Sequence, residues 1–225
     1  MKPIMFATVL ALTTARPAET SAAEEFVDLF PTNGTPAGWL VRSWDNVANA
    51  PPPGAVWKVE DGILNGSNPR GTWLVSEKDY GDFVLEFEWK LGERGHSGCG
   101  LRFPPYGDPA FNGLELQMVD PRYYGTDKND ADTLTGAIYK AVAPTVQIYR
   151  PLEWNKYAIT CRGPNIKVEL NGKIILEVDL STQTKKLERG APLNLRPRKG
   201  RIGFQELSRG GGHVAIRNAR VKELN

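Results

Sequence analysis

The stretch DFVLEFEWKL, residues 82–91, decides the fold class because its side chains alternate with a period of two. One set of alternate positions is wholly apolar: Phe83, Leu85, Phe87, Trp89 and Leu91. The positions between them are mostly charged: Val84, Glu86, Glu88 and Lys90. Successive side chains of a β-strand point to opposite faces, so this pattern predicts a long antiparallel strand with one buried face.

The same period continues along the chain. Residues 156–180 read as three strands, with turns at Gly-Pro-Asn (163–165) and at Asn-Gly (171–172), and Asn-Gly is the strongest short hairpin signal. Further strands are predicted at 56–65, 72–75, 97–103, 113–119, 135–139, 201–206 and 213–224. No convincing helix is found, and 77–80 forms at most one turn. Roughly ten short strands between turns favour an all-β fold, a two-sheet antiparallel β-sandwich.

The N-terminus has the pattern of an export signal. Lys2 precedes an apolar stretch at 4–12, and the small residues Ser21 and Ala23 fit a cleavage site after Ala23. We therefore expect a signal peptide at 1–23 and one exported domain at 24–225, in the periplasm or outside the cell. The apolar stretch is too short to span a bilayer. No other segment of the sequence is long and apolar enough to cross a membrane.

The net charge and the cysteines of the sequence exclude some classes of partner and site. The net charge is only +2 and no run of Lys or Arg occurs, so nucleic acid is not an expected partner. Cys99 and Cys161 both fall in predicted strands, where a free thiol packs as a small apolar group. We favour two packed thiols over a disulfide, and their spacing offers no metal motif.

The stretch NGLELQMVD, residues 112–120, carries the polar residues of greatest interest. Alternation places Glu115 and Gln117 on one face of a strand, opposite an apolar face, while Asp120 falls at an odd offset and points away unless a bulge turns it back. The polar face is either solvated or lines a site. Spacing alone favours the solvated surface.

The neighbouring stretch HSGCGLRF, residues 96–103, places Gly98, Gly100 and Arg102 on one face. Two glycines leave space above a sheet for a ligand to approach. A bulge, with Arg102 paired to a nearby acid such as Glu115, explains the pattern equally well. His96 comes directly before this strand and is a candidate base or ligand.

With these stretches in view, the chain resembles the 3-keto-disaccharide hydrolase family. The resemblance covers residues 26–224 and rests on nine motifs in the family's order. They include VDLFPTNGTPAGW (27–39), WKVEDGILNGS (57–67), SGCGLRF (97–103), GLELQMVD (113–120) and RIGFQE (201–206). The resemblance implies an exported domain with a concanavalin-like lectin/glucanase jelly roll.

Two positions depart from the family pattern. His96 stands where the family usually has Asn, and Leu207 stands where it usually has His, within Gln205-Glu206-Leu207-Ser208. The second change removes a histidine that a catalytic step of the family would need. His96 is the one candidate replacement near these motifs.

The resemblance implies cleavage of a 3-keto-glycoside. The C3 ketone makes the C2 proton acidic, so a base removes it, the glycosidic oxygen leaves C1, and water adds back. The reaction needs a base, a stabiliser for the enolate oxygen and an acid for the leaving oxygen.

By the same resemblance we expect Glu115 as base or metal ligand and Arg102 as enolate stabiliser, with Asp120 and Glu206 as acids or cation ligands. The expected sugar-binding residues are Gln117, Tyr139, Gln205, Ser97 and His96. A divalent Mg²⁺ or Ca²⁺ suits the carboxylate and amide oxygens, and no organic cofactor is implied.

Two other functions compete with this one. A carbohydrate-binding module would keep the sandwich without catalysis, and the missing histidine at Leu207 favours it. The tryptophans, however, are too scattered to form a stacking platform: Trp39, Trp44, Trp57, Trp73 and Trp154. A retaining glucanase is least favoured, because Glu-x-Asp-x-x-Glu is its motif and Gln117 replaces the middle acid.

Overall fold

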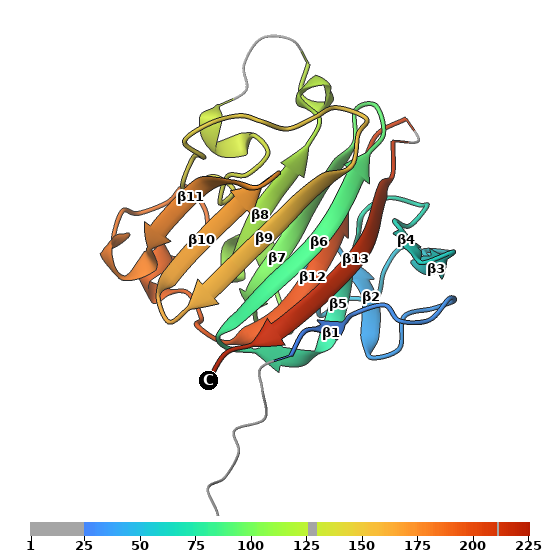
Figure 1. Cartoon of the computed structure of the whole chain (residues 1–225), viewed down its shortest axis with the longest axis horizontal. Helices are drawn as coiled ribbons and strands as arrows, with labels where there is room; N and C mark the ends of the chain where they lie inside the picture. Colours follow the sequence, from blue (N-terminus) through green and yellow to red (C-terminus); the bar gives the residue numbers. More distant parts are fainter. Residues whose placement is uncertain (1–24, 126–129, 211) are drawn as a thin grey trace, which may run out of the picture.

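The computed structural model describes residues 25–125, 130–210 and 212–225, and in these residues the chain is a sandwich of two antiparallel sheets (Figure 1). This confirms the all-β prediction. The expected signal peptide, 1–23, lies outside the described residues. Within them, no helix is long and apolar enough to cross a membrane.

The larger sheet has the strand order β11-β10-β9-β6-β13-β4-β3, and β1 pairs with β13 at its edge. Its strands are β1 (Val27–Asp28), β3 (Lys58–Glu60), β4 (Ile63–Asn65), β6 (Phe83–Leu91), β9 (Asn155–Arg162), β10 (Asn165–Leu170), β11 (Lys173–Asp179) and β13 (Val214–Glu223).

The smaller sheet has the order β2-β5-β12-β7-β8. Its strands are β2 (Trp39–Ser43), β5 (Thr72–Tyr80), β7 (His96–Phe103), β8 (Leu114–Val119) and β12 (Gly200–Glu206). The helical pieces are short: α1 (Pro109–Asn112) and the 3₁₀ turns η1 (Pro121–Tyr123), η2 (Ala131–Thr133), η3 (Leu180–Thr182) and η4 (Leu193–Leu195).

Several predicted boundaries were wrong. The strand expected at 72–75 continues to Tyr80, so 77–80 is strand and not a turn. The segment 56–65 is two short strands, because Asp61 and Gly62 take positive φ angles and turn the chain between them. Residues 135–139 form no strand; only Ile138 bridges to Leu116 and Val142. The strands β1 and β2 were not expected.

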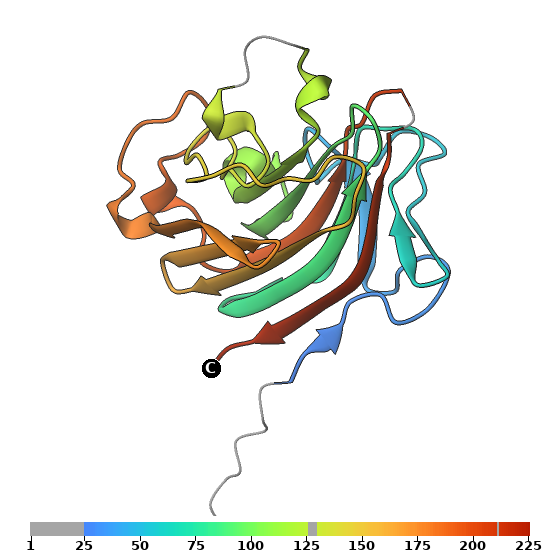
Figure 2. The same ribbon diagram turned by 45° about the horizontal axis from the view of Figure 1, so that its top comes forward.

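The core fills the space between the two sheets. Along β6 the apolar set identified in the sequence is buried and the set between it is half-exposed, as the alternation predicted. Cys99 on β7 and Cys161 on β9 are both buried free thiols, which confirms the expectation of packed thiols. Both sheets are curved, and the segments between β7 and β9, coloured green to yellow, gather on one side of the molecule (Figure 2).

Candidate functional site

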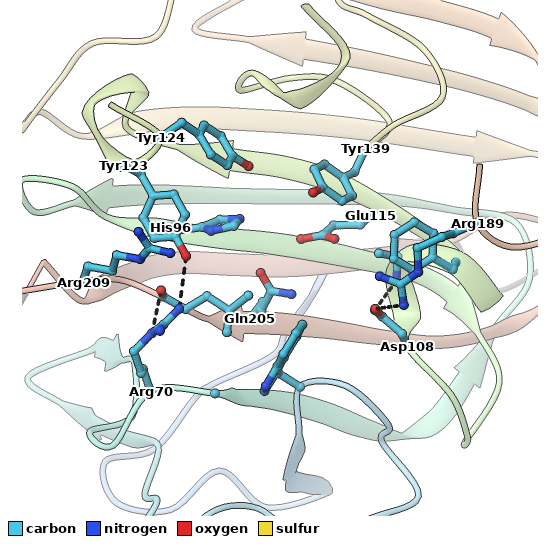
Figure 3. A pocket seen from close by; sticks show the side chains of 15 residues that line it. Arg70, His96, Asp108, Glu115, Tyr123, Tyr124, Tyr139, Arg189, Gln205 and Arg209 are labelled. Atoms are coloured by element: carbon cyan, nitrogen blue, oxygen red, sulfur yellow. Dashed lines mark hydrogen bonds and ion pairs between the residues drawn. The ribbon is translucent and has the colours of Figure 1, made fainter. Parts of the chain in front are cut away.

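A pocket of about 540 Å³ lies on the outer face of the smaller sheet (Figure 3). Three adjacent strands supply its floor: His96 on β7, Glu115 on β8 and Gln205 on β12. The walls come mainly from the long connections: Trp44, Arg70, Gly71, Asp108, Ala110, Phe111, Tyr123, Tyr124, Tyr139, Arg189, Leu207 and Arg209. Its volume lies within the range of small-molecule sites, about 300–1,000 Å³.

Strand alternation explains why Glu115 faces this pocket. Its neighbours Leu114 and Leu116 lie in the core between the sheets, so Glu115 points to the opposite face. Glu115 pairs in register with Gly100, and its carboxyl leans across Gly98. A Cβ atom on Gly98 would lie 2.0 Å from Glu115 Oε1, so only glycine leaves room for the carboxyl there.

Glu115 sits at the centre of the pocket in an unusual environment. The residue is 2% exposed, and its Oε1 has no hydrogen-bond partner among the described residues. Burial, and next the negative charge of Asp108, raise the pKa of Glu115 well above its usual value of 4.5. A carboxyl of this kind holds its proton more tightly than an ordinary glutamate, and it is a stronger base once ionised.

A second carboxyl, Asp108, occupies one end of the pocket (Figure 3). Its Oδ1 caps α1 by accepting from the Ala110 backbone N–H at 3.1 Å, and its Oδ2 lies 3.7 Å from an Arg189 nitrogen. The Arg189 guanidinium stacks 3.9 Å from the centre of the Phe111 ring. Burial raises the pKa of Asp108 to about 6.

The other end of the pocket is cationic. Arg70 Nε donates to the Leu207 carbonyl at 2.9 Å and its Nη2 donates to the Tyr123 hydroxyl at 3.1 Å, while Arg209 stacks 4.4 Å from the centre of the Tyr123 ring. Within the described part of the chain, neither arginine pairs with a carboxylate. Burial lowers the pKa of His96 to about 3, so this histidine is neutral at neutral pH.

Of the expected site residues, Glu115, Tyr139, Gln205 and His96 line the pocket together. Gln205 Oε1 and His96 Nδ1 are buried with no hydrogen-bond partner among the described residues, so both are free to accept from a ligand. Gln117 lies beneath the surface: it is fully buried, and its Nε2 donates to the Tyr124 hydroxyl at 3.1 Å.

Ser97 does not reach the pocket. It lies one position from His96, so alternation turns it inward, and its Oγ donates to the Gln205 carbonyl at 2.6 Å. The structure therefore does not bring Ser97 to the pocket, where the expected substrate-binding role would need it, because the hydroxyl is buried and already paired. It holds β7 against β12.

The structure places Arg102 outside the pocket and matches the alternative that the sequence left open, a bulge with Arg102 paired to an acid, here Asp82. Leu101 and Arg102 together stand opposite one residue of β12, which is a bulge, and Arg102 takes a φ of +53°. The extra residue reverses the alternation, so the side chain is buried away from the pocket. It donates to the carbonyls of Gly81 and Gly163 at 2.8 and 2.6 Å and to Asp82 at 2.9 Å.

Two expected acids are used structurally. Asp120 accepts three hydrogen bonds from Arg122, at 2.6–2.9 Å, and although burial acts to raise its pKa, these bonds outweigh burial and hold it below the usual value. Glu206 faces inward and accepts from the backbone N–H groups of Ser208 and Val214 at 2.7 and 2.8 Å. Neither carboxyl lines the pocket.

Within the described residues, the expected cation ligands do not come together. Asp120 is engaged with Arg122, and the described residues contain no group of three or more His, Cys, Asp or Glu side chains that could hold a metal ion. The carboxyls in the pocket are two, Glu115 and Asp108, and Arg189 lies beside the second. This set does not fit a resident divalent cation.

Sequence reasoning missed the residues on the long connections. Asp108, Arg189, Arg70 and Arg209 are far apart in the chain, and no spacing links them to Glu115. One local signal was available: Asp108 precedes Pro109, the pattern of an N-cap followed by proline at the first helical position. This signal predicts the start of α1, but it does not identify Asp108 as part of the pocket.

The sequence profile of the 3-keto-alpha-glucoside-1,2-lyase-like domain matches residues 25–222. The chain belongs to this family. This confirms the resemblance to the 3-keto-disaccharide hydrolases drawn from the motifs. No curated protein matches the chain in sequence.

Solved structures share the fold of this family member. A candidate glycosyl hydrolase from Parabacteroides distasonis ATCC 8503 is 25% identical with a TM-score of 0.73, over 89% of this chain and 100% of that one. A second from the same organism is 24% identical with a TM-score of 0.72, over 90% and 95% of the two chains. The laminarinase from Rhodothermus marinus, at 14% identity and a TM-score of 0.51 over 88% and 96%, shares the jelly-roll fold alone. The family is carbohydrate-active and similar to glycosyl hydrolases.

Proposed function

We propose that the pocket cleaves 3-keto-glycosides by elimination followed by hydration. A base takes the proton from C2, and the electron pair of that bond moves toward C3 to form an enolate. The pair returns to form a C1–C2 double bond, the C1–O bond breaks, and the departing oxygen takes a proton. Water then adds hydroxide at C1 and a proton at C2, so the net result is hydrolysis.

The observation that carries this proposal is the state of Glu115. It is a buried carboxyl with a raised pKa and a free Oε1 at the centre of a sugar-sized pocket. A carboxylate with a raised pKa is a stronger base, which suits removal of a proton from carbon. We assign Glu115 as the base at C2, with Gln205 and Tyr139 as hydrogen-bonding partners of the sugar.

Asp108 suits the role of the acid. Its pKa of about 6 makes it a stronger acid than an alcohol, so it can protonate the departing oxygen. The reacting form carries one proton, on Asp108, while Glu115 is ionised. The negative charge of Asp108 helps to raise the pKa of Glu115, so a protonated Asp108 favours ionisation of Glu115. In this arrangement C1 of the sugar lies toward Asp108 at one end of the pocket, and C3 lies toward the other end.

The cationic end then faces C3. In Figure 3, Glu115 lies between Asp108 on one side and Arg70, Arg209 and His96 on the other. The strand register supports the same order, because Leu114 at the start of β8 follows α1 while Val119 at its end pairs with His96. Two arginines without carboxylate partners among the described residues are suited to stabilise an enolate oxygen. This role replaces the one expected of Arg102.

A second candidate function rests on Leu207. This apolar side chain lines the pocket at the position where the family usually carries histidine. If that histidine is indispensable to catalysis, the pocket binds a sugar without cleaving it. The localisation belongs to the proposal too: the pattern at 1–23 supports export to the periplasm or the cell exterior.

One experiment separates the two functions. A chromogenic 3-keto-glucoside and its unoxidised counterpart are incubated with the protein and with Glu115→Gln, and Glu153→Gln, on an exposed loop, serves as control. We expect release from the keto substrate alone, and a loss of about a thousandfold or more in Glu115→Gln only. Binding of the keto sugar without release would favour the lectin-like function. Equal release from both substrates would contradict the elimination route.

A further inference from the structure

A second hollow, of about 650 Å³, adjoins the pocket on the Asp108 side. The two share three lining residues, Asp108, Phe111 and Arg189. The hollow therefore begins where the pocket ends. The proposed function does not use this space.

Both apolar and charged side chains line the hollow. Among the apolar ones, Tyr106 is 59% exposed and Leu195 is 70% exposed. Phe111, Pro104 and Pro197 continue the same surface. Exposed apolar area of this kind, next to a pocket, is typical of a ligand-binding groove.

The floor of the hollow is firmly held. Arg196 is 3% exposed, and it donates to the carbonyls of Ala110 and Gly113 at 2.8 Å and of Ala191 at 3.0 Å. These bonds tie the connection that carries Leu195 to α1, which carries Phe111. The apolar side chains are thus presented by a fixed backbone, which lowers the entropic cost of binding.

We propose that this hollow binds the leaving alcohol of the substrate, and that this alcohol is large and apolar. The inference rests on the proposed function: if Asp108 protonates the oxygen on C1, the group attached to that oxygen lies on the far side of Asp108. That space is the hollow. Its apolar side chains select 3-keto-glycosides of aromatic or bulky apolar alcohols over those of a second sugar.

The test compares two substrates, 2-phenylethyl 3-keto-glucoside and methyl 3-keto-glucoside. Both release a simple alkyl alcohol, and only the first carries a large apolar group. The variant carries Tyr106→Ala and Leu195→Ala, and Leu152→Ala, 54% exposed and outside the hollow, is the matched control. We expect the protein to prefer the phenylethyl substrate. The double variant should lose about tenfold in kcat/KM on that substrate, because apolar contact area is removed, and retain its rate on the methyl substrate.

Other outcomes point to different failures. If both substrates are cleaved and the double variant changes neither or both equally, the hollow does not bind the leaving group, while the proposed function stands. Preferential cleavage of a 3-keto-disaccharide, insensitive to the double variant, also overturns the apolar selection. If no keto-glycoside is cleaved, the proposed function fails and the inference fails with it.

Discussion

At the scale of the residue, the site depends on two carboxyls whose surroundings differ. Glu115 is buried without a partner at Oε1, whereas Asp108 caps a helix and lies beside Arg189. Burial raises the pKa of both, but the proposed roles differ because Glu115 lies at the centre and Asp108 at the end of the pocket. In this proposal the position in the pocket, and not the residue type, assigns base and acid.

The role of Asp108 predicts a dependence on the leaving group. Asp108→Asn keeps the helix cap, since asparagine is as good an N-cap as aspartate. Alkyl 3-keto-glucosides need a proton on the departing oxygen, so their kcat/KM should fall about a hundredfold or more. A 4-nitrophenyl 3-keto-glucoside, which leaves as a stable phenolate, should lose much less. A uniform loss on both substrates would show that Asp108 is not the acid.

Arg102 illustrates a residue whose role is structural. Arg102→Ala removes a buried cation that contacts two carbonyls and Asp82, and leaves these groups without a donor. We expect a loss of about 3 kcal/mol in the free energy of unfolding, measured by urea denaturation, with kcat/KM per folded molecule unchanged. Arg162→Ala, at the exposed C-terminal end of β9, should change neither. Lost activity in folded Arg102→Ala would restore its catalytic assignment.

At the scale of the element, the floor of the pocket follows from three paired strands with glycine at chosen positions. Gly98 on β7 leaves the space into which Glu115 on β8 leans. Because the positions alternate, the same strands send Cys99 and Leu116 into the core. One set of strands therefore builds core and site together.

This arrangement predicts the effect of a single methyl group. In Gly98→Ala the new Cβ would lie 2.0 Å from Glu115 Oε1, so the carboxyl must move. We expect kcat/KM to fall about a hundredfold, because a displacement of about 1 Å costs that much, while the protein still folds. Gly81→Ala, with no atom within 4 Å of the added Cβ, is the control and should keep full activity. Activity retained in Gly98→Ala would mean that Glu115 is not held where the proposal needs it.

The elements also explain which parts of the fold the sequence predicted. Alternation identified β6 and the outward face of Glu115, and alternation together with the turn residues identified the β9–β11 hairpins, because these features depend on local sequence. A bulge at Arg102 was one of the interpretations that the sequence allowed, and the sequence could not decide between them because the bulge depends on how β7 registers with β12. Asp108 and Arg189 were missed because only the folded connections bring them together.

At the scale of the whole molecule, the two carboxyls link function to stability. A carboxyl whose pKa is higher in the folded state binds its proton more tightly there than in the unfolded chain. Its contribution to stability is complete below the unfolded pKa and is lost as the pH rises through the folded pKa. Burying Glu115 and Asp108 therefore weakens the protein at higher pH.

The pH dependence of the free energy of unfolding tests whether burying these two carboxyls destabilises the protein at higher pH. The free energy of unfolding should decline as the pH rises from the ordinary carboxyl values, 3.8 and 4.5, through about 6 and beyond. Glu115→Gln cannot ionise, so its stability should decline less over the same range and exceed that of the natural protein at neutral pH. Glu153→Gln should follow the natural protein. Equal slopes in Glu115→Gln and the natural protein would show that Glu115 is not perturbed.

The central claim is that cleavage begins with removal of the C2 proton at Glu115, and an isotope effect tests it most directly. The substrate is a 3-keto-glucoside carrying deuterium at C2, compared with the same compound carrying hydrogen. We predict a clearly slower kcat/KM for the deuterated compound, because breaking that bond belongs to the rate-limiting chemistry. Equal rates, together with cleavage of the unoxidised glucoside, would contradict the account.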